Sequence, residues 1–178
     1  DCWPVASWAS MDYFGRWKAL HYAAKRFFAP LMISACEEGT KVSLHVSNEK
    51  MEAVKGFAEW RLMDNRSNVI DEGSVEFHSD ALSAKECIVL DFSELLDTPD
   101  KTRNTYLEFR LVTANQIVSS GTVLFARAKH FNFLEPNLKV NCLENADSFI
   151  VEISAEAFAK FIELDLSESD AIFSDNYF

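Results

Sequence analysis

The side chains that most often do chemistry in proteins are present in this chain, but they are scattered along it. Zinc sites and many nucleophilic sites need His or Cys at short, characteristic spacings. The four histidines are His21, His45, His78 and His130. The four cysteines are Cys2, Cys36, Cys87 and Cys142. Neither set has a metal-like spacing, so the sequence predicts no metal site and no cofactor.

Other catalytic patterns are also missing. Ser7 and Ser10 lack the Gly-x-Ser-x-Gly context that exposes a hydrolase nucleophile. The acidic pairs Glu37-Glu38 and Asp71-Glu72 are interpreted as solvated turns, and a calcium site at either pair stays open. No glycine-rich phosphate loop occurs. None of these patterns therefore points to a catalytic residue in this chain.

The cysteines are predicted to be free, mostly buried thiols, because an unpaired Cys behaves as a small apolar side chain. An immunoglobulin-type disulfide between Cys36 and Cys87, with Trp60 between them, is the alternative. Cys36 precedes the first convincing pair of strands, which favours the free thiols.

Charge and hydropathy exclude two classes of partner. The net charge is −11 over 178 residues, whereas residues 1–30 hold four basic and two acidic side chains. The rest is therefore strongly acidic, which disfavours nucleic acid, since phosphates require a cationic surface. No stretch approaches the roughly 20 uninterrupted apolar residues of a membrane span. We expect a solvated acidic surface, no nucleic-acid partner and no membrane partner.

One helix is predicted, from Gly15 to Phe28. Its apolar residues recur at helical spacing: Trp17, Leu20, Ala24, Phe27 and Phe28. Asp12 or Ser10 could cap the start, and Pro30 marks the end. A stripe this aromatic must pack on other protein, so we expect Trp17, Leu20, Ala24 and Phe27 to face a protein surface.

After Pro30 the apolar period changes to two, which is typical of half-buried strands. The strands predicted here are around 42–46, 57–63, 73–79, 86–92, 106–112 and 116–128. Polar turns are predicted at 64–68 and 113–115. Short strands at this spacing favour a mainly β protein, with an immunoglobulin-like antiparallel sandwich of about seven strands at 31–128. Val42, Leu44, Val46, Leu107, Phe109 and Leu111 are predicted to face its core.

Residues 129–178 are predicted to be an incomplete second sandwich. Lys129–Pro136 looks like the exit from the first one. Strand candidates follow at 138–143, 148–154, 159–165 and 172–173. About forty residues remain after Pro136, whereas a sandwich of this type needs roughly a hundred. We expect this region to be the least stable part of the chain, because open sheet edges promote swapping and self-association.

Two stretches resemble a known family. Asp1-Cys2-Trp3-Pro4 with Gly15–Pro30, and Phe173-Ser-Asp-Asn-Tyr-Phe178, are similar to segments of β-mannosidases of glycoside hydrolase family 2. The resemblance implies that 1–30 is the last loop and helix of a (β/α)8 catalytic barrel (a TIM barrel), that 31–128 is an accessory sandwich, and that the chain opens inside a domain. It also implies a retaining glycosidase, in which two carboxyl groups about 5 Å apart do the chemistry.

The resemblance implies that both catalytic glutamates lie on barrel strands upstream, and no Glu occurs before Glu37 that could supply them here. The expected substrates are β-mannosides or manno-oligosaccharides. Asp1, Trp3 and Trp8 would bind substrate in the intact enzyme only, since barrel sites lie in such loops; packing of loop on helix is the alternative for both tryptophans. A periplasmic, secreted or lysosomal location is expected rather than a cytoplasmic one, with the upstream barrel as partner.

A second hypothesis is a non-catalytic carbohydrate-binding or adhesion sandwich. Its sugar platform would be a surface aromatic such as Trp60 or Tyr106. Trp60 shares a strand face with Ala58 and Leu62, so we expect it to be buried. An exposed flat row of aromatics would favour the binding module instead.

Overall fold

The computed structural model describes residues 9–146, 148–166 and 171–178. They form two compact units. One is continuous, Leu31–Ala159, and the other joins the N-terminal residues up to Pro30 with Lys160–Phe178. Each unit is described by itself below. No helix among the described residues is long and apolar enough to cross a membrane.

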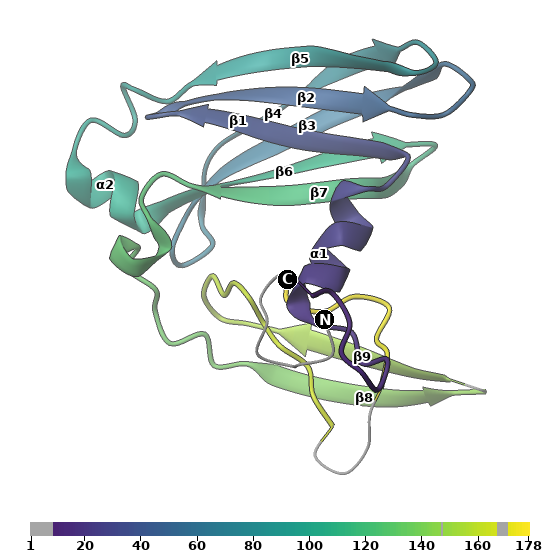
Figure 1. The fold of residues 1–178 in the computed structure, drawn as a ribbon. Coiled ribbons are helices and arrows are strands. Elements are labelled where there is room, and N and C mark those ends of the chain that lie inside the picture. The colour runs from purple at the N-terminus through teal and green to yellow at the C-terminus, as the bar shows by residue number, and fades with distance from the viewer. Residues whose placement is uncertain (1–8, 147, 167–170) are drawn as a thin grey trace. The chain divides into compact units, whose positions relative to one another are not determined.

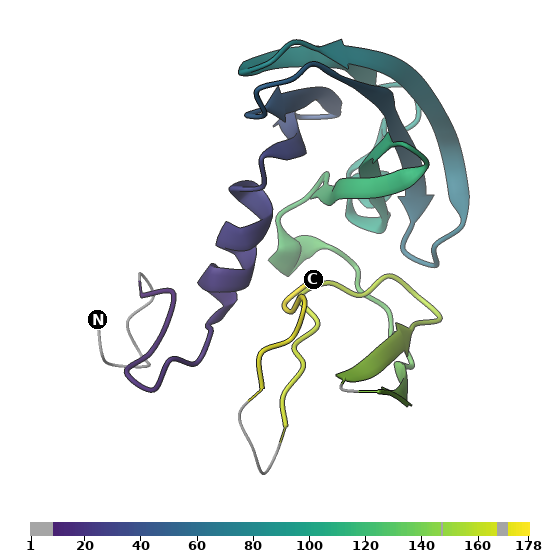
Figure 2. The ribbon, with the colours of Figure 1, turned by 90° about the vertical axis from the view of Figure 1, so that its right-hand side faces the viewer.

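The continuous unit contains a sandwich of two antiparallel sheets (Figure 1). The first has the order β1 (Leu31–Glu38), β2 (Lys41–Asn48), β5 (Ser83–Asp91). The second has the order β4 (Val69–Ser79), β3 (Val54–Asp64), β6 (Thr105–Thr113), β7 (Gln116–Leu124). These seven strands confirm the predicted mainly β, immunoglobulin-like fold. Figure 2 shows the same strands in a second orientation.

The core lies between the two sheets and is built by alternation. Val42, Leu44 and Val46 on β2 are fully buried. On β6, Leu107 and Leu111 are fully buried too, and Phe109 is 5% exposed. All six predicted core positions are therefore confirmed. A slip of one residue in either strand would turn its apolar side chains to water, so burial fixes the register.

Two elements escaped the sequence analysis. Strand β1 buries Leu31 and Ile33 but also carries apolar side chains on its other face, which hides the period of two. Helix α2 (Pro99–Asn104) has six residues and buries none of them, so no apolar period marks it. Its signals are local: Thr98 accepts a hydrogen bond from the Lys101 backbone N–H, and Pro99 starts the first turn.

The predicted turns at 64–68 and 113–115 are confirmed, each by a local cause. Asp64 Oδ1 accepts hydrogen bonds from the backbone N–H groups of Arg66 and Asn68, both at 2.9 Å. These bonds outweigh the opposing effect of burial and lower the pKa of Asp64. Between β6 and β7, Ala114 and Asn115 have φ of 47° and 62°. Two consecutive left-handed residues are typical of a tight type I′ hairpin turn.

After β7 a single turn of 3-10 helix, η1 (Ala128–His130), leads to a two-stranded hairpin of β8 (Lys139–Asn145) and β9 (Ser148–Ser154). Both strands agree with prediction. The strand candidates at 159–165 and 172–173 are wrong: those residues are irregular. They lie in two arms held mainly by side-chain hydrogen bonds, so no ladder of backbone bonds forms.

Helix α1 (Ala19–Phe27) starts later than predicted. The Asp12 carboxylate does not cap it. Instead it holds the preceding turn, accepting from Phe14 N at 2.8 Å and from Arg16 N and Nε at 3.0 and 2.5 Å. Gly15, with φ of +82°, completes that turn. The predicted apolar stripe is also wrong in part, because Leu20 and Phe27 are 37% and 47% exposed, whereas Tyr22 is 2% exposed.

Candidate functional site: helix α1 and the C-terminal segment

Tyr22 is the centre of the N- and C-terminal unit. Its hydroxyl accepts a hydrogen bond from the Phe173 backbone N–H at 3.2 Å. Its ring packs against Trp17 and Tyr177, with centroids 5.3 and 6.0 Å away. A helix residue thus satisfies a backbone donor 151 positions later, at a site where an unmet N–H would be costly.

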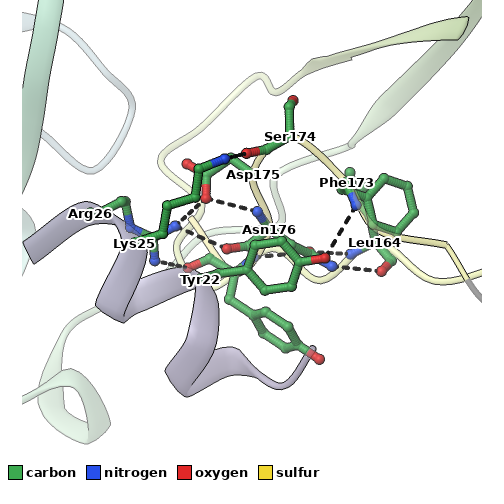
Figure 3. A network of polar contacts seen from close by, with 9 residues as sticks. Tyr22, Lys25, Arg26, Leu164, Phe173, Ser174, Asp175 and Asn176 are labelled. Carbon is green, nitrogen blue, oxygen red and sulfur yellow. Dashed lines mark hydrogen bonds and ion pairs between the residues drawn. The ribbon is translucent and has the colours of Figure 1, made fainter. Parts of the chain in front are cut away.

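The last turn of α1 supplies two cations to the same segment (Figure 3). Lys25 Nζ donates to the Ser174 carbonyl at 2.6 Å. Arg26 pairs with the Asp175 carboxylate and donates to the carbonyls of Asn176 and Tyr177 at 3.0 and 3.2 Å. The guanidinium suits this role, because its planar fork can serve several acceptors at once. Cations at a helix C-terminus also interact favourably with the helix dipole.

Asn176 joins the two arms of the C-terminal segment, which run side by side in Figure 2 (yellow). It is 3% exposed. Its Oδ1 accepts from Leu164 N at 2.7 Å and its Nδ2 donates to the Leu164 carbonyl at 2.8 Å. Ile162 N adds a bond of 2.8 Å to the Phe178 carbonyl. The Asn176 side-chain amide therefore makes the two hydrogen bonds to Leu164 that a backbone partner would make in a strand ladder.

The pKa values of Tyr177 and Lys160, both in the C-terminal stretch of this unit, are shifted. The Tyr177 hydroxyl donates to Glu163 at 2.6 Å, and this hydrogen bond, with burial, raises the pKa of Tyr177 to about 12. Burial and the nearby Arg26 charge lower the pKa of Lys160. Neither group sits beside a nucleophile. The role that this network can have is structural: its hydrogen bonds and ion pair fix α1 to residues 173–177. We refer to the contacts of Tyr22, Lys25 and Arg26 with 173–177 as the α1 clasp.

The comparisons with known proteins address the same two regions. A family model described as the mannosidase Ig/CBM-like domain matches residues 40–130, just over half of the chain. The chain belongs to this family. A second model, an Ig-fold domain, matches residues 133–178.

The relatives are named β-mannosidases. The chain is 30% identical to β-mannosidase of Mus musculus over 191 residues and 27% identical to β-mannosidase B of Thermothelomyces thermophilus over 200 residues. These matches cover 100% and 99% of this chain but only 21% and 23% of the relatives, so the chain spans about a fifth of their length.

Among solved structures, a β-D-mannosidase from Dictyoglomus thermophilum shares the fold, with a TM-score of 0.80 and 22% identity. This match covers all of the chain and 21% of that protein. Together the comparisons confirm the resemblance to the β-mannosidases of glycoside hydrolase family 2.

The candidate substrate-binding residues Asp1, Trp3 and Trp8 lie outside the described residues, so their roles stay predictions. The clasp residues were not singled out by the sequence analysis. Two features of the sequence could have indicated them: the basic residues Lys25 and Arg26 at the end of the helix, and the family resemblance at 173–178.

Neither residue named for the aromatic platform of the binding-module hypothesis is exposed. Trp60 packs against the core but is half-buried rather than buried, and its indole N–H has no hydrogen-bond partner among the described residues. Tyr106 is 5% exposed and stacks on Phe158, with ring centroids 3.7 Å apart. Burial raises the pKa of Tyr106. The buried Tyr106 therefore offers no flat surface to a sugar, whereas the half-buried Trp60 is one of the residues that line a pocket with parts of β4 and β6.

Two further expectations on reactive side chains are corrected. Cys36 and Cys142 are exposed and Cys87 is half-buried, so the described cysteines are free as predicted but not mostly buried. Burial raises the pKa of Cys87. Neither acidic pair lies in a turn. Glu37-Glu38 ends strand β1, where it pairs with β2, and Asp71-Glu72 lies within strand β4, since cross-strand pairing extends that strand back to Val69.

The acidic and histidine side chains do not form a reactive cluster in the described part of the chain. His45 Nε2 contacts Ser43 Oγ at 2.9 Å and lies 3.9 Å from Glu86, so one nitrogen faces both groups and no proton relay results. No group of three or more His, Cys, Asp or Glu could hold a metal among the described residues.

The outer face of β4, β3 and β6 carries a shallow pocket of about 460 Å³. Arg110 Nε donates to Glu59 at 2.6 Å, and Arg61 lies 3.3 Å from Glu72. Four of the five charged residues that line this pocket are thus paired across the strands, which is the usual use of facing opposite charges on a sheet.

Proposed function

We propose that this chain is the C-terminal accessory portion of a retaining β-mannosidase that hydrolyses terminal β-D-mannose residues from β-mannosides. The observation that carries the proposal is the similarity to named β-mannosidases over the full length of the chain. Under this proposal the division is residues 1–30 for the end of the catalytic barrel, 31–128 for the sandwich and 129–178 for a further Ig-like part. The enzyme acts on β-mannosides or manno-oligosaccharides in a periplasmic, secreted or lysosomal compartment.

The chain alone should be inactive. A retaining glycosidase needs an acid/base and a nucleophilic carboxylate about 5 Å apart. Under the proposal both belong to the barrel upstream. The accessory portion then acts through packing. When it is separated from the rest of the enzyme, we expect its open sheet edges to promote self-association.

The α1 clasp gives this accessory role a physical form. If α1 is the last barrel helix, the clasp ties the barrel's end to the C-terminal segment through Tyr22, Lys25 and Arg26. Asp1, Trp3 and Trp8, which precede α1 in the chain, would bind substrate in the intact enzyme. Small displacements of positioning groups are costly in catalysis.

The test uses the longer protein that contains this chain and a chromogenic β-mannoside. The longer protein should turn over the substrate, and the 178-residue chain at micromolar concentration should not. In the longer protein, Arg26→Ala should raise KM or lower kcat several-fold, while Lys25→Ala, which loses one exposed contact, should be nearly silent. Reproducible hydrolysis by the chain alone, abolished by substituting one of its own acids, would overturn the proposal.

A further inference from the structure

The turn between β3 and β4 contains the sequence Asn65-Arg66-Ser67, which matches the Asn-x-Ser/Thr acceptor of N-glycosylation. It is the one such triplet in the chain. Arg66 and Ser67 are exposed, as an acceptor triplet requires, but Asn65 is half-buried. The surroundings of its side chain therefore decide whether a glycan can be accommodated.

Both hydrogens of the Asn65 amide are used. Nδ2 donates to Asn104 Oδ1 at 3.1 Å and to the Asn132 carbonyl at 2.7 Å. The Asn132 side chain donates to the same Asn104 oxygen at 3.0 Å. We call Asn65, Asn104 and Asn132 the asparagine cluster. It joins the β3–β4 turn, the end of α2 and the segment after η1.

The backbone around the cluster is tied in as well. Asn65 N donates to the Asn104 carbonyl at 2.7 Å, and the Asn65 carbonyl accepts from Phe158 N at 3.2 Å. Asn132 N donates to the Arg103 carbonyl at 2.8 Å. Residue 65 thus contacts the start and the end of the stretch that carries the β8–β9 hairpin.

Apolar packing accompanies these bonds. Phe131 and Phe158 are 6% and 9% exposed and bury Tyr106 and Met63 at this end of the sandwich. The Phe158 ring stacks on Tyr106 at 3.7 Å. Docking of the 131–158 stretch therefore depends on aromatic burial together with the asparagine cluster.

We propose that a glycan on Asn65 and docking of the 131–158 stretch on the sandwich exclude each other. In the transfer, a bond forms between Asn65 Nδ2 and C1 of the sugar, the bond from C1 to the pyrophosphate of a lipid-linked donor breaks, and one amide proton leaves. The modified nitrogen keeps a single hydrogen, so at least one of its two contacts is lost. The sugar ring would also have to occupy space 2.7–3.1 Å from Nδ2, where Asn132 and Asn104 lie.

The mutual exclusion has two consequences, which depend on whether docking or glycosylation comes first. A docked chain shields Asn65 from the transferase, and a chain modified before docking cannot close the cluster. The hairpin and its connection would then be released from the sandwich, with Phe131 and Phe158 exposed to water.

The experiment expresses the chain behind a secretion signal in a eukaryotic cell that N-glycosylates. Three forms are compared: wild type, Ser67→Ala and Phe158→Ala. Ser67→Ala is the control, since it destroys the triplet and leaves the Asn65 amide intact; it removes one 3.3 Å contact, between Ser67 Oγ and the Tyr106 hydroxyl. Occupancy at Asn65 is measured by mass spectrometry, and trypsin cleavage at Lys129 and Lys139 reports docking.

Glycosylated molecules should be cleaved at these lysines at least five-fold faster than Ser67→Ala. Phe158→Ala, which weakens docking, should raise the occupancy of Asn65 several-fold over wild type. Glycosylated wild type that resists trypsin as well as Ser67→Ala would overturn the proposal. The proposal would also be overturned if neither wild type nor Phe158→Ala carried a glycan on Asn65, because docking would then not be what shields the amide.

Discussion

Arg26 and Asp175 form an ion pair between positions 149 residues apart in the sequence. The same guanidinium donates to two carbonyls beside Asp175, so one helix residue holds three consecutive positions of the C-terminal segment. The whole sandwich lies between these positions in the chain. The contact explains why the two terminal stretches form one compact unit.

Replacing Arg26 by Ala should loosen the C-terminal segment. Hydrogen bonds to charged groups contribute about 1.5–3 kcal/mol, and solvent screening lowers this for a partly exposed pair, so we expect about 1–2 kcal/mol. The backbone amides of Ile162, Leu164 and Phe173 should then exchange roughly 5–30 times faster in hydrogen-exchange measurements. Arg26→Lys should recover only part of the protection, because an ammonium lacks the fork.

Lys25→Ala is the matched control for this substitution. It removes a single exposed contact in the same helical turn and should leave exchange within about two-fold of wild type. Equal exchange rates in Arg26→Ala and wild type would contradict the assigned role of the clasp.

Gly73→Ala should destabilise the sandwich. An added Cβ would lie 2.3 Å from Trp60 Cζ2, which is far inside van der Waals contact. Overpacking of this kind costs about 1–3 kcal/mol in chemical denaturation. In a Trp60→Phe background the penalty should shrink, because Phe has no atoms at the clashing end of the indole. Ser74→Ala, next in the strand, serves as control; an unchanged penalty in Trp60→Phe would show that the ring is not the cause.

The carboxyl group of Asp91 should titrate far below the ordinary range. Hydrogen bonds from the Ser93 side chain and backbone, and then the Lys41 ammonium 3.1 Å away, lower the pKa of Asp91 from 3.8 to about 2. A lowered folded-state pKa means that the stabilisation is present above pH 3.8 and is lost as the pH falls through about 2. Carbon-13 NMR titration should show this midpoint, and Ser93→Ala should raise it more than Lys41→Ala. A wild-type midpoint near 3.8 would contradict the assignment.

The β8–β9 hairpin should be the first site of limited proteolysis. Every residue of β8 is exposed, and the two-stranded sheet has no third strand to cover its edges. Low burial lowers the free energy of local opening, and cleavage follows opening. Trypsin should cut at Lys139 before any site in β1–β7. Equal protection of both regions would mean that the terminal strands complete a stable fold of their own.

The sandwich was predictable because its signals are local. The alternation at 42–46 and 107–111 fixes which side chains face the core, and the turn residues at 64–68 and 113–115 carry their own hydrogen bonds or left-handed dihedrals. The hairpin at 139–154 was found for the same reason. Strand β1 was missed because its two faces are both partly apolar.

The candidate site could not be read in the same way. The apolar spacing of α1 indicated a buried stripe that included Leu20 and Phe27, yet the buried residue is Tyr22. Its hydroxyl accepts a hydrogen bond from Phe173, about 150 residues away, and no local pattern indicates this contact. Asn65 likewise looks like an ordinary turn residue until Asn104 and Asn132 are brought to it.

The sequence by itself therefore determined the alternation of most strands, the apolar faces of β2 and β6, the turns at 64–68 and 113–115, and the enzyme family that the chain resembles. Only the tertiary structure decided the partners of Tyr22, Arg26 and Asn65. The physical reason is the range of the interactions. Backbone propensity and alternation act over a few residues, whereas each of these polar groups finds its partner through chain closure, which leaves no periodic trace in the sequence.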